Sequence, residues 1–358
     1  MLTATARLKI SLFTHGIAVS PEANAILSGN GARPLTMADY ASTSGITLRL
    51  TGDVWVNAPV GEHNPNFVTS PRHTLEIGGN GFVVRGDDIE VEAVPLPVPA
   101  YQGELNARGE LYSSYAITHS DRVRISPVEG CAITCQFCDL PYEFRYRTKT
   151  VEGLADSVAR ALRDEMLPAR HVLISGGLPR KADYDWMREV WKAIPAAFPG
   201  VEVDVMMVPA PELFVPSELH ADGIAGLSIN LEMWNEDLAR KVMPAKWRIG
   251  RERWLSVIED AVQVYGPGRV RSLLLVGIEP IEDTLAGVEA LAARGCDPVL
   301  SPFRPDPSTP MRDIPPPTEA DLGEVWERSE EIVRRYDARL GPRCAPCMHN
   351  TLTFPEAP

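Results

Sequence analysis

The sequence predicts an α/β protein: a partial or complete (β/α) barrel with a β-rich N-terminal region and a short C-terminal extension. Two observations predict this fold. After about residue 121, short apolar runs alternate with amphipathic windows of helical period, as in βα units of a parallel sheet. Before that point, apolar and polar residues alternate with a period of two, which indicates strands. We therefore divide the chain into residues 1–118, 119–312 and 313–358.

Residues 1–118 are predicted to form a β-rich domain, to which no motif assigns a role. Alternation marks strands at residues 46–50, 54–56, 82–85 and 89–91, and the Gly-Gly-Asn-Gly segment at 78–81 indicates a turn. A proline-rich run at residues 95–99 then separates this region from the rest of the chain.

Residues 119–312 are predicted to form the barrel core. Its strands are expected at residues 122–127, 171–175, 201–208, 226–231, 270–278 and 297–303. Apolar residues three or four apart between these runs indicate helices. In such barrels the chemistry belongs to the loops that follow the carboxyl ends of the strands. A last helix over residues 317–339, with Leu322, Trp326, Ile332 and Tyr336 inward, begins the C-terminal extension.

Composition excludes some classes of function. The formal charge of −13 disfavours a nucleic-acid partner, because binding to phosphates depends on Lys and Arg. No run approaches the roughly 20 apolar residues of a membrane helix, and the N-terminus does not read as a signal peptide. We therefore expect a cytoplasmic protein. Five of the six cysteines fall in two tight groups, which in that compartment points to metal binding.

The decisive segment places Cys131, Cys135 and Cys138 on one short loop after the first predicted barrel strand. Three thiolates can each bind a different iron of a cube-shaped cluster, which normally takes four protein ligands, so one iron stays open. Zinc is the competing interpretation, but a structural zinc ion needs four closed ligands and no fourth lies nearby in the sequence. A disulfide cannot account for three cysteines.

This spacing, with Phe137 before the third cysteine, resembles the radical S-adenosylmethionine (SAM) superfamily. The core, about residues 121–312, is most similar to the group of biotin synthase, methylornithine synthase and hydrogenase-maturation enzymes. The resemblance implies a catalytic [4Fe–4S] cluster on the three cysteines, with SAM chelated to the open iron. Reductive cleavage would give a 5′-deoxyadenosyl radical that abstracts hydrogen from a small-molecule substrate. It also implies an electron donor such as flavodoxin or ferredoxin, and places Phe137 beside the adenine unless that ring only packs the loop.

Further positions match motifs of that family. Gly176 and Gly177 stand where its Gly-Gly-acid motif contacts the SAM amino group, although Leu178 replaces the acid and a plain βα turn is the alternative. Asn230 and Glu232 lie two apart and match an Asn-x-Leu-acid stretch that contacts SAM, with the acid on the ribose hydroxyls.

The resemblance also implies roles for four later residues. Arg248 is the predicted clamp for the SAM carboxylate, with Lys246 as the alternative and a solvated basic turn as the competing interpretation. Ile278 would flank the adenine, and Arg304 is a predicted substrate residue suited to a carboxylate or phosphate.

Near the C-terminus, Cys344 and Cys347 form a CxxC pair that predicts a second metal site, zinc or iron–sulfur. Cys296, His349 or a second subunit would have to complete it, and a redox pair or no role are the alternatives. The predicted strands two, three and five contain no cysteine, which disfavours sulfur insertion of the biotin synthase type.

Our leading hypothesis is a radical SAM enzyme that rearranges, fragments or functionalises a small molecule. One alternative is a radical SAM enzyme that uses an auxiliary metal cluster at the C-terminal CxxC for group transfer. An alternative of another class is a non-catalytic iron–sulfur or zinc protein that senses or scaffolds. Substrate and oligomeric state do not follow from the sequence.

Overall fold

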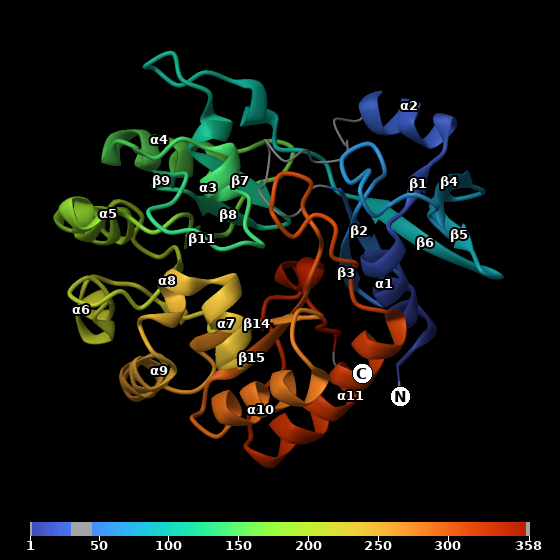
Figure 1. The fold of residues 1–358 in the computed structure, drawn as a ribbon. Coiled ribbons are helices and arrows are strands. Elements are labelled where there is room, and N and C mark those ends of the chain that lie inside the picture. The colour runs from blue at the N-terminus through green and yellow to red at the C-terminus, as the bar shows by residue number, and fades with distance from the viewer. Residues whose placement is uncertain (1, 30–44, 356–358) are drawn as a thin grey trace.

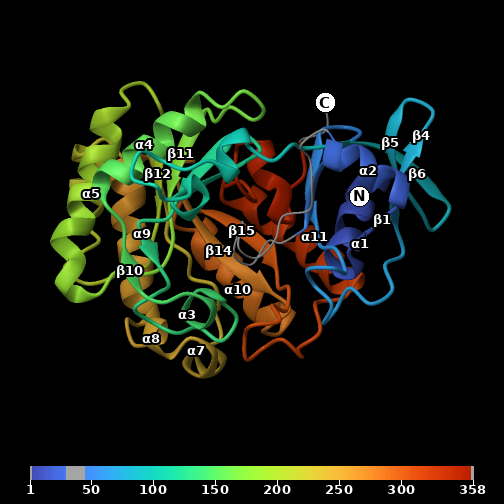
Figure 2. The same ribbon diagram turned by 90° about the horizontal axis from the view of Figure 1, so that it is seen from above.

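The computed structural model describes residues 2–29 and 45–355 and contains two main sheets, one at each side of Figure 1. Residues 1, 30–44 and 356–358, which belong to the predicted first and last regions, lie outside the described residues. Seen from above, the last helix and the C-terminal tail lie between the two sheets (Figure 2). Within the described part of the chain, no helix combines the length and apolar character needed to cross a membrane.

The larger sheet confirms the predicted α/β barrel in its partial form. Its strands run in the order β15-β14-β13-β12-β11-β8-β7, and the six from β8 to β15 are parallel to one another. These strands are β8 (Arg122–Ile125), β11 (His171–Ile174), β12 (Val203–Met206), β13 (Gly226–Ser228), β14 (Val270–Val276) and β15 (Asp297–Pro302). Each lies within a predicted apolar run. Sequential strands are neighbours, as expected of repeated βα crossovers.

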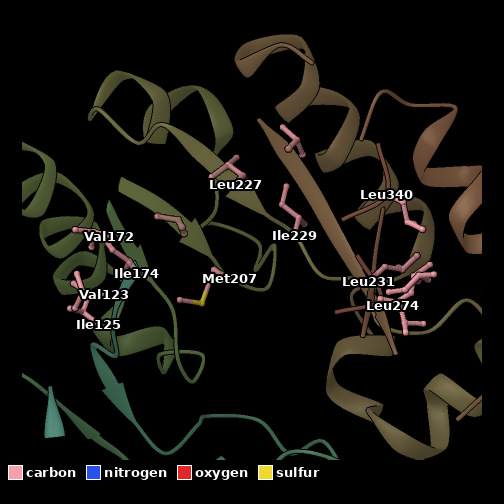
Figure 3. Packing of buried hydrophobic residues seen from close by; sticks show 14 of the residues in the cluster. Val123, Ile125, Val172, Ile174, Met207, Leu227, Ile229, Leu231, Leu274 and Leu340 are labelled. Atoms are coloured by element: carbon pink, nitrogen blue, oxygen red, sulfur yellow. The ribbon is translucent and has the colours of Figure 1, made fainter. Parts of the chain in front are cut away.

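Helices cover the outside of this sheet (Figure 1). The four longest between its strands are α4 (Val151–Leu162), α5 (Tyr184–Ala197), α9 (Arg251–Tyr265) and α10 (Ile281–Ala292). Each carries one of the predicted apolar faces, and Leu154 and Val158 of α4 are fully buried. Figure 3 shows part of the hydrophobic core against which these helices pack. Val123 and Val172 lie on adjacent strands, and Leu227 and Leu274 lie further along the sheet.

Short elements that sequence patterns did not indicate lie in the connections between the strands. They are β9 (Val128–Glu129), α3 (Leu140–Glu143), β10 (Arg147–Thr148), η3 (Lys181–Asp183), α6 (Pro216–Ala221), α7 (Glu236–Val242) and α8 (Pro244–Trp247). Most span too few residues for a period of 3.6 or 2 to become visible.

The smaller sheet has six strands in the order β1-β4-β5-β6-β2-β3. Its strands are β1 (Ala18–Val19), β2 (Ile46–Leu50), β3 (Val54–Ala58), β4 (Thr74–Gly78), β5 (Gly81–Gly86) and β6 (Ile89–Pro95). The predicted strands and the 78–81 turn are confirmed. Two 3₁₀ helices, η1 (Ala100–Gly103) and η2 (Tyr112–Ser114), lead to β7 (Ala116–His119), which pairs with β8 of the barrel sheet. The predicted boundary at residue 118 falls inside β7, and the domain division stays a prediction.

The β-rich description of this region omitted two helices, α1 (Ala4–His15) and α2 (Pro21–Gly29). Helix α1 lies against both β3 and α11. Leu8, Ile10, Leu12 and Phe13 are all buried, so the apolar residues surround most of the helix. A helix buried on nearly all sides shows no apolar stripe, which is why periodicity did not reveal it.

The last helix, α11 (Glu319–Arg335), is shorter than predicted. It begins at a capping box, in which the Thr318 and Asp321 side chains each accept from the other residue's backbone N–H. The prediction that Tyr336 points inward is wrong. Tyr336 is the residue after the last residue of the helix, and it is 39% exposed. Its hydroxyl donates a hydrogen bond to Glu289 Oε1 at 2.9 Å.

A buried lysine joins the two ends of the chain. The Nζ atom of Lys9 on α1 donates to the backbone oxygens of Met348 and Thr353, each at 2.8 Å, and lies over the ring of Phe354. Met348 belongs to the 3₁₀ helix η4 (Pro346–Asn350) in the tail. Burial lowers the pKa of Lys9 well below its ordinary value of 10.5.

Lys9→Met should lower the free energy of unfolding by about 1–3 kcal/mol, because two buried carbonyls lose their donor. The folded state holds the Lys9 proton less firmly than the unfolded chain, so this group's contribution to stability increases as pH rises toward the ordinary lysine value. The difference between wild type and variant in urea unfolding should therefore grow from about pH 7 to pH 9. The exposed Lys192→Met on α5 is the control, and a loss independent of pH would contradict the assignment.

Candidate functional site

The three predicted cysteines face one cavity at the carboxyl ends of the barrel strands. Cys131 lies two residues after β9, Cys135 is buried, and Cys138 lies two residues before α3. The cavity is lined by Cys131, Ile133, Cys135, Phe137, Cys138, Leu140, Pro141, Ser175, Gly176, Gly177, Leu178, Met206, Met207, Val208, Asn230, Glu232 and Lys246. The structure thus brings together residues from four loops that are far apart in the sequence.

Backbone hydrogen bonds fasten the cysteine loop on two sides. The Leu178 N–H donates to the Cys131 sulfur at 3.2 Å, and the Ala132 N–H donates to the Leu178 oxygen at 2.9 Å. On the other side, the Gln136 N–H donates to the oxygen of Val242, the last residue of α7, at 2.8 Å. The sulfurs are therefore positioned by the turn after β11 and by α7.

Gly177 permits the contact between the cysteine loop and the turn after β11. A Cβ atom there would lie 1.8 Å from the Gly130 oxygen and 2.8 Å from the Cys131 Cα atom. Gly130 itself has a φ of +70° and packs against the backbone of Phe144 and Tyr146. Any side chain at Gly177 would push the cysteine loop away, because the obstacle is backbone.

Burial disfavours the thiolate form of two of these cysteines, Cys135 and Cys138. It raises the pKa of Cys135 to about 12, against the opposing effect of Lys246, and it also raises the pKa of Cys138. A metal ion reverses this preference, because a coordinating thiol loses its proton. None of the six cysteines, all of which lie in the described ranges, is in a disulfide.

The spread of the three sulfurs fits a cluster better than a single ion. Ligands of one tetrahedral zinc ion all lie close together. Among the described residues, the cysteine triplet does not form a set whose donor atoms all lie within 4.8 Å of one another. Ligands that each bind a different iron are spaced more widely. The donor set is therefore compatible with an iron–sulfur cluster and is not a compact site for a single ion.

A buried ion pair forms the far wall of the cavity. The Lys246 Nζ atom lies 2.6 Å from Glu232 Oε2, and both side chains are about one-tenth exposed. Burial lowers the pKa of Lys246, but Glu232 and the nearby cysteines outweigh that effect and raise it overall. Glu232 adopts a φ of +67°, a strained conformation for this residue type. Its backbone is held by bonds to Leu273 and Leu275 of β14.

Among the other predicted SAM contacts, Asn230 lines the cavity, and its Oδ1 accepts from Ser228 at 2.8 Å and from the Leu273 N–H at 3.3 Å. Ile278 is not in the lining, although it packs in the apolar cluster around Cys135. Arg248 is exposed and does not line the cavity, whereas Lys246, the alternative, does.

The predicted substrate residue Arg304 also lies away from the cavity lining. Its guanidinium donates to Asn57 Oδ1 of β3 and to Asn350 Oδ1 of η4, each at 3.1 Å. These contacts tie the end of β15 to the N-terminal sheet and to the tail.

Sequence reasoning missed the apolar side of the site. Met206, Met207 and Val208 line the cavity beside the thiols. A separate cluster around Cys135 contains Met233, Ala239, Val242, Met243, Phe303 and Met311, with Phe137, Cys138, Leu238 and Ile278 against it. The methionines at the end of the predicted 201–208 strand were the available signal, since the carboxyl ends of strands face the site.

Comparisons with known proteins give partial matches, and no family model matches the chain. A curated relative, bacteriochlorophyllide c C-7(1)-hydroxylase of Chlorobaculum limnaeum, is 31% identical over 122 residues, which is 34% of this chain and 30% of the relative. The chain therefore spans less than a third of that relative's length.

Three solved structures resemble the chain with TM-scores below 0.5. HydG, a maturase of the [FeFe]-hydrogenase, has a TM-score of 0.49 at 14% identity over 61% of this chain and 50% of that one. A radical SAM methyltransferase from Sphaerobacter thermophilus has 0.48 at 18% identity over 78% and 81%. SuiB of Streptococcus suis bound to S-adenosylmethionine has 0.47 at 15% identity over 63% and 50%. At these TM-scores and sequence identities, the structural similarity by itself implies no function.

Gly177→Ala should lower the free energy of unfolding by about 1–3 kcal/mol, because the added methyl group overlaps backbone. It should also reduce the iron bound per chain after anaerobic reconstitution, since the cysteine loop moves. Gly79→Ala is the matched control, because a Cβ there meets nothing within 4 Å. Equal iron content in the two variants would contradict a positioning role for this contact.

Proposed function

We propose that this chain is a radical SAM enzyme that holds a [4Fe–4S] cluster through Cys131, Cys135 and Cys138 and acts on a small-molecule substrate. The observation that carries the proposal is the shared cavity. Three thiols, a Gly-Gly turn and a buried Lys246–Glu232 pair converge at the carboxyl ends of parallel strands. When bound and reduced, the cluster supplies the electron that cleaves SAM to a 5′-deoxyadenosyl radical.

The chain's own residues would bind and orient SAM. The backbone at Gly176 and Gly177 lines the cavity beside the cysteine loop and would contact the SAM amino group. The Glu232 carboxylate can accept hydrogen bonds from ribose hydroxyls, and Lys246 holds that carboxylate in place.

The apolar residues around Cys135 would exclude water from the reacting atoms. Met233, Met243, Phe303 and Met311 are each at most 7% exposed and pack against Phe137 and Ile278. An apolar surface without water suits radical chemistry, because excluding water suppresses side reactions of a reactive intermediate.

The name of the curated relative favours one of the three possible reactions on the substrate. The curated relative is named as a hydroxylase, so we place functionalisation of a C–H bond before rearrangement or fragmentation. The proposal also includes an external electron donor such as flavodoxin or ferredoxin and a cytoplasmic location.

Cys135→Ala should abolish both the cluster absorbance and the SAM-dependent formation of 5′-deoxyadenosine, because two thiols cannot hold the cluster. Cys296→Ala, which removes a buried thiol outside this cavity, should keep both signals. Anaerobic reconstitution followed by absorbance and product chromatography measures them. A Cys135→Ala protein that still forms 5′-deoxyadenosine would end the proposal, and wild type that binds no SAM would favour the sensor or scaffold class.

Lys246→Met should weaken SAM binding by about tenfold or more, because the buried Glu232 carboxylate loses its counter-charge. Arg248→Met, which changes an exposed residue two positions later, should leave the dissociation constant within about twofold. Equilibrium dialysis against SAM with the reconstituted protein compares the two. A large loss in Arg248→Met alone would instead assign the carboxylate clamp to Arg248.

A further inference from the structure

We propose that Asp121, His171, Cys344 and Cys347 bind one zinc ion that fastens the C-terminal tail to the barrel. The four residues offer one carboxylate oxygen, one imidazole nitrogen and two sulfurs, all within 4.8 Å of one another. Neither Asp121 nor His171 was expected here from sequence. Cys296 and His349, the expected partners of the CxxC pair, are not in the set.

The spacing of these donor atoms is that of a single tetrahedral ion. The Cys344 sulfur lies 3.5 Å from Asp121 Oδ1, and the Cys347 sulfur lies 3.5 Å from His171 Nε2. Zinc bonds of about 2.0 Å to nitrogen or oxygen and 2.3 Å to sulfur, at tetrahedral angles, separate two such donors by about 3.5 Å. A two-iron cluster would divide its ligands between two metal atoms and so spread them further apart.

The fold brings these donors together from three segments. Asp121 directly precedes β8 and His171 begins β11, and the parallel register pairs His171 with Arg122. Cys347 belongs to η4, and Cys344 stands two residues before that helix. Cys347 is 6% exposed and the other three are half-buried. Four protein donors leave no open position, which is typical of structural zinc.

This site lies at the opposite end of the barrel from the cysteine triplet. Asp121 and His171 stand at the amino ends of their strands, whereas the triplet loop and Gly176 follow the carboxyl ends. The four residues of β11 alone extend about 13 Å. That separation disfavours group transfer from a metal at Cys344 and Cys347 and favours a structural role.

The ion would stabilise a tail that also holds other parts of the protein. Beside the site, the Ser120 hydroxyl donates to the Pro346 oxygen at 3.2 Å, and Arg343 pairs with Asp297 at 3.1 Å. Further along, the tail receives the bonds of Lys9 from α1 and of Arg304 from the end of β15. Losing the metal should therefore loosen the N-terminal region as well as the tail.

The test measures zinc and iron separately in the 358-residue protein after dialysis. We expect about one zinc per chain in wild type and in Cys135→Ala, and loss of that zinc in Cys344→Ser/Cys347→Ser. His171→Ala should lose zinc, whereas the matched His220→Ala, which changes an exposed residue of α6, should keep it. Cobalt added to the zinc-free protein should give the visible bands of a tetrahedral thiolate site.

Stability supplies an independent readout. A chelator should lower the midpoint of thermal unfolding of wild type but not of Asp121→Asn, whose side chain keeps its shape and loses its charge. Wild type that binds neither zinc nor cobalt, a Cys344–Cys347 disulfide in protein purified without air, or iron in place of zinc would each overturn the proposal. Retention of zinc in Cys135→Ala separates this outcome from any failure of the proposed radical SAM function.

Discussion

The contact on which the candidate site depends is that between Gly177 and the backbone of Gly130 and Cys131. Only a residue without a Cβ atom fits there, and the contact places the turn after β11 against the cysteine loop. The Leu178 N–H can then reach the Cys131 sulfur. Because the turn follows β11, an interior strand of the parallel sheet, the sulfurs are held against the carboxyl end of the barrel core.

The buried thiols and the ion pair around this contact are consistent with a site that binds a cation. A buried thiol with a raised pKa, such as that of Cys135, favours its neutral form. Among the described residues that line the cavity, Lys246 and Glu232 form the only buried ion pair, and their charges balance each other. A metal cluster would supply the positive charge that converts the thiols to ligands. At the other end of the same strands, a compact donor set fits a single ion instead, so spacing distinguishes the two sites.

Features that depend on residues close together in the sequence could be predicted from the sequence alone. The strands at 171–175 and 270–278 and the helix around Leu154 follow from periodicity, and the cysteine spacing points to the cavity because three donors share one loop. Helix α1 could not be predicted, since burial on nearly all sides removes its stripe. The resemblance favoured Arg248 over Lys246 as the predicted clamp, whereas the fold of α8 places Lys246 against Glu232.

By itself, the sequence determined the order of βα units, the thiol loop and its place after the first strand, because these depend on neighbours along the chain. Tertiary structure alone decided which distant side chains meet. Asp121, His171 and Cys347 are separated by scores of residues and share no local pattern. They converge because parallel strands begin at one edge of the sheet and the tail, held by Lys9, returns to that edge.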